Sequence, residues 1–323
     1  MSGPRVTVII PNYNHAEFLE QRIKSVLLQT FTDFELIILD DASTDNSRAI
    51  IEKFEKEDKR ISFYPSSNNS GSPFVQWNKG VKLATTDLIW IAESDDTASP
   101  EFLDVMVHQH VSNPDLALAY CQSTRMDDAS TITGTWRAFT DIFDVELFST
   151  NFVMEGIDFL RRFLIHRNVI PNASAVLFKK SVYDQVDGAD ENLKTNSDWL
   201  TWMKMLLNHQ LAFVSASLNN FRYHKHSVIA KVHAVSNGKY KEQYDLSMRK
   251  VFDCFCSEFP AVVPSDIVKE NKKYQSFDYG KKGIYEFYNG QYYKGLVNIF
   301  RASLSPAFTL GYFKQLLKDK NLI

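Results

Sequence analysis

Three near-continuous apolar runs, each ended by polar residues, constrain the fold of this chain more than any other feature of its sequence. They cover positions 6–10, 34–39 and 87–92, and segments with helical spacing lie between them. Strands this apolar are usually buried on both faces, as in a parallel sheet covered by helices. The sequence therefore predicts an α/β fold with a Rossmann-like, mostly parallel sheet. Ligands of such sheets bind beyond the carboxyl ends of the strands.

The third run is followed by the tetrad ESDD at positions 93–96, which places three carboxylates at the end of a strand. Manganese or magnesium takes one or two carboxylates and fills its other positions with water and phosphate oxygens, so the tetrad suits a metal-bound diphosphate. A polar turn before a helix, with Ser99 as N-cap and Pro100 as first helical residue, is the other interpretation. The tetrad alone leaves both open.

The other two runs also end in polar residues, PNYN at 11–14 and DDASTD at 40–45. The carboxylate of Asp41 can accept the ring N–H of uracil, thymine or guanine, and Tyr13 offers a face on which a base can stack. An Asx turn at Asp41 and a half-buried packing role for Tyr13 are the structural alternatives. Three polar strand ends are thus expected to converge on one crevice.

These segments resemble glycosyltransferase family 2, which has the GT-A fold. The matching stretches are VTVIIPNYN at 6–14, SVLLQTFTDFELIILDDASTDNS at 25–47, the tetrad at 93–96 and SDWLTWMKML at 197–206. The resemblance spans roughly positions 5 to 230. It implies an inverting, metal-dependent transfer of a hexosyl or N-acetylhexosaminyl group from a nucleotide sugar to a hydroxyl. The expected donor is a UDP-sugar, ahead of a dTDP- or GDP-sugar.

The resemblance also implies roles for individual residues near the donor. Asp96 is the better candidate for direct coordination of Mn²⁺ or Mg²⁺, Asp95 is expected near the ribose or a metal-bound water, and His224 is a third candidate ligand. Glu93 stands where aspartate is commonest and is expected further from the metal. The residues implied in nucleotide binding are Pro11, Tyr13, Asp41, Asn78, Asp95 and Arg222.

The resemblance assigns the catalytic base to Asp198, at the start of a predicted helix whose apolar residues include Trp199 and Trp202. A base there would deprotonate the acceptor hydroxyl. Ser197 stands where many members of the family have Glu. Asp198 is also a good N-cap residue type, so helix capping is the alternative interpretation.

Composition agrees with an enzyme that carries a basic tail. Positions 1–220 hold 19 Lys or Arg against 30 Asp or Glu, and positions 221–323 hold 17 against 9. Many aromatic residues lie among the basic ones in the tail, a mixture that suits the headgroup layer of an anionic membrane. A solvated helical face is the alternative. No nucleic-acid motif accompanies the tail, so nucleic acid is not an expected partner.

The expected organisation has a GT-A glycosyltransferase domain at 1–232 and a helical, basic, aromatic-rich region at 233–323. The first comprises a nucleotide-binding half at 1–122 and an acceptor-side half at 123–232. No run of 18 apolar residues and no signal-peptide core appears, so the protein is expected in the cytoplasm, with peripheral contact on the inner face of the plasma membrane. The chain has three cysteines, Cys121, Cys254 and Cys256, which read as free thiols.

The implied acceptor is a glycan or a lipid-linked saccharide in bacterial surface polysaccharide synthesis. Two alternatives remain: a sugar nucleotidyltransferase, and a non-catalytic module that binds nucleotide sugars or glycans. The first is expected to carry a glycine-rich, basic phosphate loop after the first strand, and PNYN at 11–14 is neither. The sequence leaves the donor sugar, the linkage and the oligomeric state open.

Overall fold

The structure is a computed structural model that describes residues 5–193, 195–224, 227 and 241–319. The chain forms two compact units. The first comprises residues up to 191 together with 201–224, and the second comprises 192–200 together with the chain from 225 onward.

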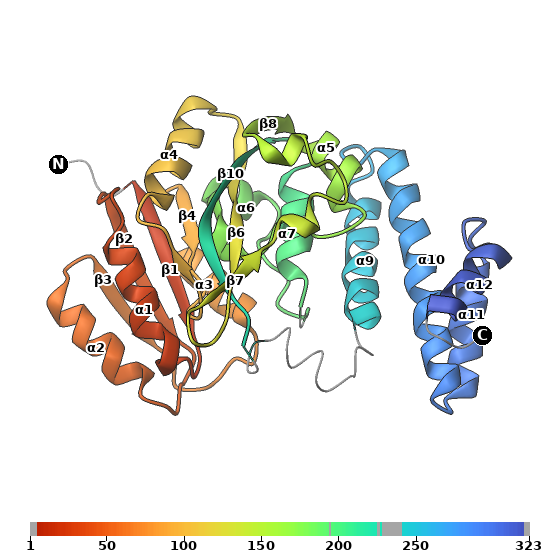
Figure 1. Ribbon diagram of the computed structural model, residues 1–323, viewed down its shortest axis with the longest axis horizontal. Coiled ribbons are helices and arrows are strands. Elements are labelled where there is room, and N and C mark those ends of the chain that lie inside the picture. The colour runs from red at the N-terminus through yellow and green to blue at the C-terminus, as the bar shows by residue number, and fades with distance from the viewer. Residues whose placement is uncertain (1–4, 194, 225–226, 228–240, 320–323) are drawn as a thin grey trace. The chain divides into compact units, whose positions relative to one another are not determined.

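The first unit is built on one sheet, in which the described strands follow the order β3-β2-β1-β4-β9-β6-β10-β5. β7 pairs with β6 and β8 pairs with β10 (Figure 1). The strands are β1 Val6–Asn12, β2 Phe34–Asp40, β3 Ile61–Pro65, β4 Leu88–Ile91, β5 Thr97–Ala98, β6 Leu116–Met126, β7 Ile132–Thr135, β8 Phe152–Glu155, β9 Val176–Lys179 and β10 Gln210–Arg222.

The strands β3, β2, β1 and β4 pair in parallel, and β9 is inserted antiparallel between β4 and β6. Because β9 is antiparallel to both β4 and β6, β6 points in the same direction as β4 and β1. β10 pairs in parallel with β6 and so has this direction too. The mostly parallel sheet predicted from the apolar runs is confirmed. Since β1 lies between β2 and β4, the polar residues after these three strands meet at one edge of the sheet.

Helices pack on both faces of this sheet. The helices of the first unit are α1 Ala16–Leu27, α2 Ser47–Glu57, α3 Pro73–Leu83, α4 Phe102–Ser112, α5 Gly156–Phe159 and α6 Lys180–Gln185, and α7 Ser197–Met205 belongs partly to each unit. On one face Leu19 of α1 and Phe102 of α4 join Val8 of β1 in a single buried cluster. On the other, a Cβ at Gly80 of α3 would lie 2.5 Å from Ile9 Cγ2, so α3 can pack this closely only with glycine there.

Two segments of the sequence look less regular than the structure shows them to be. Residues 211–214 and 218–223 have the pattern of two separate strands but form the single strand β10, whose pairing with β6 shifts register between Val214 and Ser217. A bulge at this shift breaks the alternation of side chains. The segment 123–151, whose sequence has poor periodicity, contains the end of β6, the short strand β7 and two 3-10 turns.

The described part of the second unit is mainly helical, with α9 Lys241–Glu258, α10 Ser265–Tyr288, α11 Tyr292–Ser303 and α12 Leu310–Asp319. Arg249 Nε of α9 lies 3.1 Å from Asp278 Oδ2 of α10 in a buried ion pair. Gly290 has φ +78°, which lets the chain reverse between α10 and α11. The helical C-terminal region expected from the sequence is therefore present.

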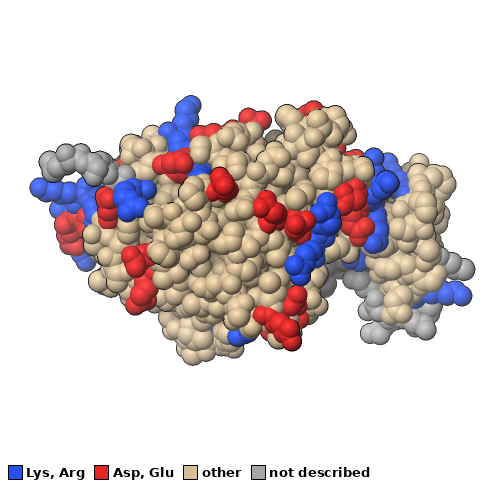
Figure 2. Space-filling model, turned by 90° about the horizontal axis from the view of Figure 1, so that it is seen from above, with Lys and Arg blue, Asp and Glu red and all other residues tan. Residues whose placement is uncertain are grey.

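Within the described ranges, no helix combines the length and apolar character needed to cross a bilayer. Acidic and basic side chains are interspersed on the face drawn in Figure 2.

Candidate active site

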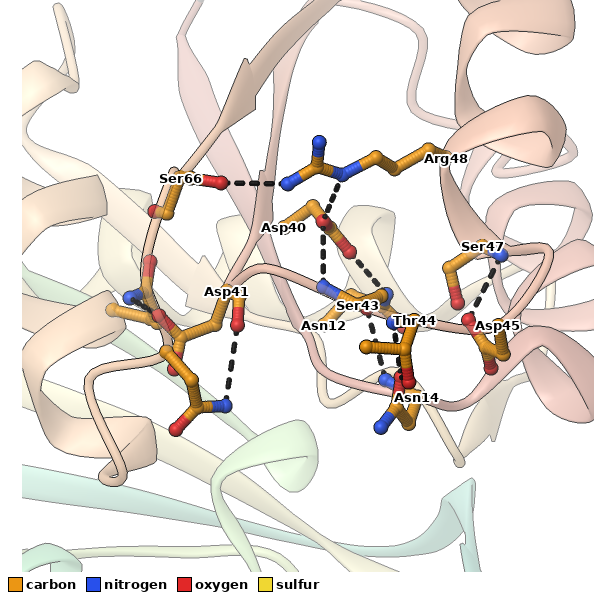
Figure 3. A network of polar contacts seen from close by, with 12 residues as sticks. Asn12, Asn14, Asp40, Asp41, Ser43, Thr44, Asp45, Ser47, Arg48 and Ser66 are labelled. Carbon is orange, nitrogen blue, oxygen red and sulfur yellow. Dashed lines mark hydrogen bonds and ion pairs between the residues drawn. The ribbon is translucent and has the colours of Figure 1, made fainter.

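The polar ends of β1 and β2 are tied into one network (Figure 3). Asn12 Nδ2 donates to Asp40 Oδ1 at 3.0 Å, and Asp40 Oδ2 accepts from Ser43 N at 3.0 Å and from Arg48 Nε at 2.9 Å. Asp40 is fully buried, so its carboxylate is committed to these partners. The network fixes the turn after β2 and thereby the position of Asp41.

Asp41 is the second buried carboxylate at this edge, with 4% of its surface exposed. It accepts from Ser70 N at 3.0 Å, from Ser70 Oγ at 2.7 Å and from Gln76 Nε2 at 2.7 Å. Asn69 Nδ2 also donates to the Asp41 carbonyl at 3.2 Å. The loop at 66–72 therefore holds the carboxylate that the sequence assigns to base recognition.

Ser70 and Gln76 were not identified from the sequence. The only signal at Ser70 is a loop composition, and the signal at Gln76 is a polar residue on the otherwise apolar buried side of α3, between Phe74 and Trp77. Tyr13, the proposed stacking residue, is 44% exposed and thus accessible to a ligand.

A second cluster lies after β4, where His15, Asp95 and His224 each offer one ligand atom, all within 4.8 Å of one another. His224 Nε2 is 3.0 Å from Asp95 Oδ2, and His15 Nδ1 is 2.7 Å from Ser94 Oγ. The three residues come from the start of α1, the turn after β4 and the chain just after β10. Two imidazoles and one carboxylate at this spacing are a fitting donor set for a divalent first-row metal ion.

Charge in the cluster favours an ionised Asp95. Burial opposes its ionisation, but the hydrogen bond from His224 and the charges of His15 and His224 outweigh burial and lower the pKa of Asp95. For Glu93, burial and the charge of Asp95 raise the pKa to about 8, although Trp77 Nε1 donates to Glu93 Oε1 at 2.8 Å. Asp95 therefore differs from Glu93 in that its surroundings favour the ionised form.

Asp96 is held differently from Asp95. It is 1% exposed, its Oδ1 accepts from the backbone N of Arg222 at 2.8 Å, and its Oδ2 accepts from Asn172 Nδ2. Burial and the charge of Asp95 raise the pKa of Asp96 to about 7. Each carboxylate oxygen of Asp96 thus accepts a hydrogen bond from a protein donor. Direct coordination of a metal ion by Asp96 remains a prediction from the sequence.

The side chain of Arg222 is directed at protein groups. It is fully buried, donates from Nε to the Asp95 carbonyl at 2.6 Å and from Nη2 to Gln21 Oε1 at 2.6 Å, and its Cζ lies 4.6 Å from the Phe18 ring centroid. A third donation, from Nη1, reaches the Asp127 carbonyl at 2.7 Å. These contacts tie Arg222 to the turn that carries Asp95. Its role in nucleotide binding remains a prediction from the sequence.

A further cation, Arg22, was not predicted from the sequence as part of the site. It is fully buried in α1, stands 4.9 Å from the Trp90 ring centroid, and its nitrogens have no hydrogen-bond partner among the described residues. Burial lowers its pKa to about 10, while the charges of Asp96, Asp95 and Glu93 raise it. Arg22 therefore stays protonated at neutral pH and offsets the negative charge after β4.

Two other nucleotide-binding candidates have structural contacts. Pro11 is buried in β1, where it pairs in register with Leu39 of β2. Asn78 Oδ1 accepts from Tyr183 Oη at 2.6 Å, and Asn78 Nδ2 donates to the Ala189 carbonyl at 2.9 Å. Asn78 thus fixes the turn after α6. Its role in nucleotide binding remains a prediction from the sequence.

Asp198 lies in the first turn of α7 and is half-buried. It belongs to the stretch 192–200, which groups with the second unit. Just before it, Asn196 Nδ2 donates to Asp245 Oδ1 at 2.8 Å and ties the start of α7 to α9. The role of Asp198 as base remains a prediction from the sequence.

The sheet order and the helices on its two faces are those of an α/β protein of the GT-A class. The model of the family described as glycosyl transferase family 2 matches residues 7–170, about half of the chain. The chain belongs to this family.

Curated relatives match over shorter stretches. The putative teichuronic acid biosynthesis glycosyltransferase TuaG of Bacillus subtilis is 39% identical over 93 residues, 29% of this chain and 36% of that protein. The poly(ribitol-phosphate) β-N-acetylglucosaminyltransferase TarP of Staphylococcus aureus is 35% identical over 119 residues, 35% of this chain and 36% of that protein. The chain thus aligns with about a third of the length of these relatives.

Solved structures share the fold over most of the chain. Residues 1–349 of S. aureus TarS in complex with UDP-GlcNAc superpose with a TM-score of 0.60 at 16% identity, over 92% of this chain and 89% of that one. The mannosyltransferase PcManGT of Pyrobaculum calidifontis, in complex with GDP-Man and Mn²⁺, gives 0.60 at 14% identity, over 100% and 81%. At these identities the likeness concerns the GT-A fold.

Proposed function

We propose that the protein transfers a sugar from a UDP-sugar to a hydroxyl of a glycan or lipid-linked acceptor in bacterial surface polysaccharide synthesis, with inversion and with a divalent metal ion. The observation that carries the proposal is the cluster of His15, Asp95 and His224 at the same sheet edge as Asp41. The cluster suits a cation bound to a diphosphate, and Asp41 suits the ring N–H of a nucleobase. Binding of a nucleotide diphosphate requires both features.

Asp95, His224 and His15 would hold the metal, which supplies Lewis-acid stabilisation of the charge that grows on the departing diphosphate. The two imidazole nitrogens favour manganese over magnesium, because magnesium prefers an all-oxygen shell. Among the solved structures with this fold, the complex of PcManGT contains Mn²⁺ and GDP-Man, and that of TarS contains UDP-GlcNAc. The Mn²⁺ of the first supports the choice of metal, and the UDP-sugar of the second supports the choice of donor.

The residues of this chain contribute binding and proton transfer. Asp41 accepts the ring N–H of the base, and Tyr13 stacks on it. Asp198 takes the proton from the acceptor hydroxyl, whose oxygen attacks the anomeric carbon opposite the departing diphosphate. Inversion follows because the new bond forms in one displacement. The name of TarP, a poly(ribitol-phosphate) β-N-acetylglucosaminyltransferase, supports a surface-polymer acceptor. A cytoplasmic location, where nucleotide sugars are made, completes the proposal.

The test is nucleotide release from a panel of UDP-, dTDP- and GDP-sugars, each incubated with Mn²⁺ and a mixture of simple glycoside and lipid-linked acceptors. We expect a UDP-sugar to give acceptor-dependent release of UDP, and we expect nuclear magnetic resonance of the product to show an inverted anomeric centre. Turnover with GDP-sugars alone would overturn the donor assignment. A retained anomeric configuration would overturn the single displacement.

A further inference from the structure

The helix α11 presents large apolar side chains to solvent. Tyr292, Leu296 and Phe300 recur every four residues and are 61%, 56% and 64% exposed, so they line one side of the helix. Tyr293 and Leu304 extend this side, with 82% and 69% exposed. We call these five residues the α11 stripe.

Close packing on α10 fixes the direction in which the stripe points. A Cβ at Gly283 of α10 would lie 2.8 Å from the carbonyl oxygen of Gly295, and a Cβ at Gly295 would lie 2.6 Å from Phe287 N. Asn298 Nδ2 of α11 donates to Glu286 Oε2 of α10 at 2.6 Å. The helix therefore buries its small and polar side against α10. Turning the stripe inward would place bulky residues where even a methyl group does not fit.

The stretch of chain that contains the stripe carries charge of one sign. Positions 287–318 contain no Asp or Glu and four cations, Lys294, Arg301, Lys314 and Lys318. Lys294 and Arg301 are exposed on α11 itself. Two copies of this surface would bring cations against cations, whereas lipid phosphates would neutralise them. Tyrosines beside aliphatic residues and basic side chains are typical of helices that lie in the headgroup layer.

We propose that α11 docks the protein on an anionic membrane, with the α11 stripe inserted at the level of the headgroups and with Lys294 and Arg301 on lipid phosphates. The inference goes beyond the transfer reaction and does not depend on it. It narrows the membrane contact expected of the whole basic tail to one helix face.

The test is sedimentation of the full chain with vesicles of phosphatidylcholine, with and without phosphatidylglycerol, at low and high salt. We expect binding to the anionic vesicles that salt weakens in part. The variant Leu296→Glu/Phe300→Glu should lower the vesicle-bound to free ratio at least tenfold. Its matched control, Leu28→Glu/Val111→Glu, places the same charges on residues 70% and 60% exposed in the first unit and should bind like the wild type.

Circular dichroism and the melting temperature establish that both variants are folded, which is expected because all four side chains are exposed. Light scattering reports the oligomeric state in the same samples. Equal vesicle binding of wild type and stripe variant would overturn the proposal. An absence of vesicle binding by the wild type would also overturn it. If the stripe variant then dissociates an oligomer, a second copy of the chain covers the α11 stripe instead of a membrane.

Discussion

His224 Nε2 lies 3.0 Å from Asp95 Oδ2, and this contact joins the chain just after β10 to the turn after β4. The two residues are 129 positions apart in the sequence, yet with His15 they form the candidate metal cluster. Asp95 combines a lowered pKa with partial exposure, 15% of its side chain. Metal ions bind deprotonated carboxylates, so an ionised, accessible Asp95 between two imidazoles favours metal binding.

The first prediction concerns metal affinity. Asp95→Asn and His224→Gln should each weaken Mn²⁺ binding at least about tenfold, because each removes a ligand of the proposed site. The electron paramagnetic resonance signal of free Mn²⁺ measures binding without any need for turnover. His108→Gln removes an exposed histidine of α4 and serves as the control. Affinity unchanged in both site variants would remove the metal role from this cluster.

The second prediction concerns the nucleobase-binding residue Asp41. Asp41→Ala should weaken UDP binding by about 1.5 to 3 kcal/mol, since it leaves a buried ring N–H without an acceptor. Ser70→Ala removes one hydroxyl that donates to Asp41 but keeps the carboxylate, so UDP should bind that variant nearly as well as the wild type. Isothermal titration calorimetry measures both. If UDP binds Asp41→Ala as tightly as the wild type, Asp41 only shapes the loop.

The third prediction concerns the catalytic base, Asp198. Asp198→Asn keeps the shape and a capping oxygen, so the melting temperature and UDP affinity should stay near those of the wild type. Transfer to the acceptor should fall at least about 100-fold. Asp190→Asn and Glu191→Gln provide matched controls on nearby carboxylates. Transfer lost in one of these controls but retained in Asp198→Asn would move the assignment to that residue.

The fourth prediction concerns acid stability and involves His110, buried in α4 with Nε2 3.0 Å from the Leu177 carbonyl. Burial lowers its pKa from 6.5 to about 4. Between those values the unfolded chain binds the proton and the native protein does not, so stability falls as the pH drops from 6.5 towards 4. The histidine contributes at most about 1.4 kcal/mol per pH unit.

His110→Gln lacks the titrating group and should lose less stability over the same range. Urea unfolding of both proteins at pH 7, 6 and 5 measures the difference. Parallel losses in the two proteins would show that His110 does not titrate on unfolding.

Much of the fold was predictable because the strand pattern is local. Runs such as 34–39 are apolar enough to indicate buried parallel strands, and the sheet confirms them. The bulge in β10 was not predictable, because the register shift depends on pairing with β6.

The site was predictable where it follows strand ends and not where it depends on distant partners. Asp41 comes directly after β2 and Asp95 lies in the turn after β4, so their place at the sheet edge could be read from the sequence. His15 reads locally as the residue before a helix, and only the fold brings it to Asp95. The guanidinium of Arg222 could equally serve a ligand or the protein, and its acceptors, backbone carbonyls and Gln21, leave no pattern in the sequence.

The most direct test of the whole account is the affinity for UDP with Mn²⁺ and with chelator, measured by titration calorimetry on the wild type and on Asp95→Asn. We predict that UDP binds the wild type at least about tenfold more tightly with Mn²⁺ than with chelator, and that Asp95→Asn loses this difference while keeping its melting temperature. Equal UDP affinity of the wild type under the two conditions would contradict a metal-bridged diphosphate at Asp95.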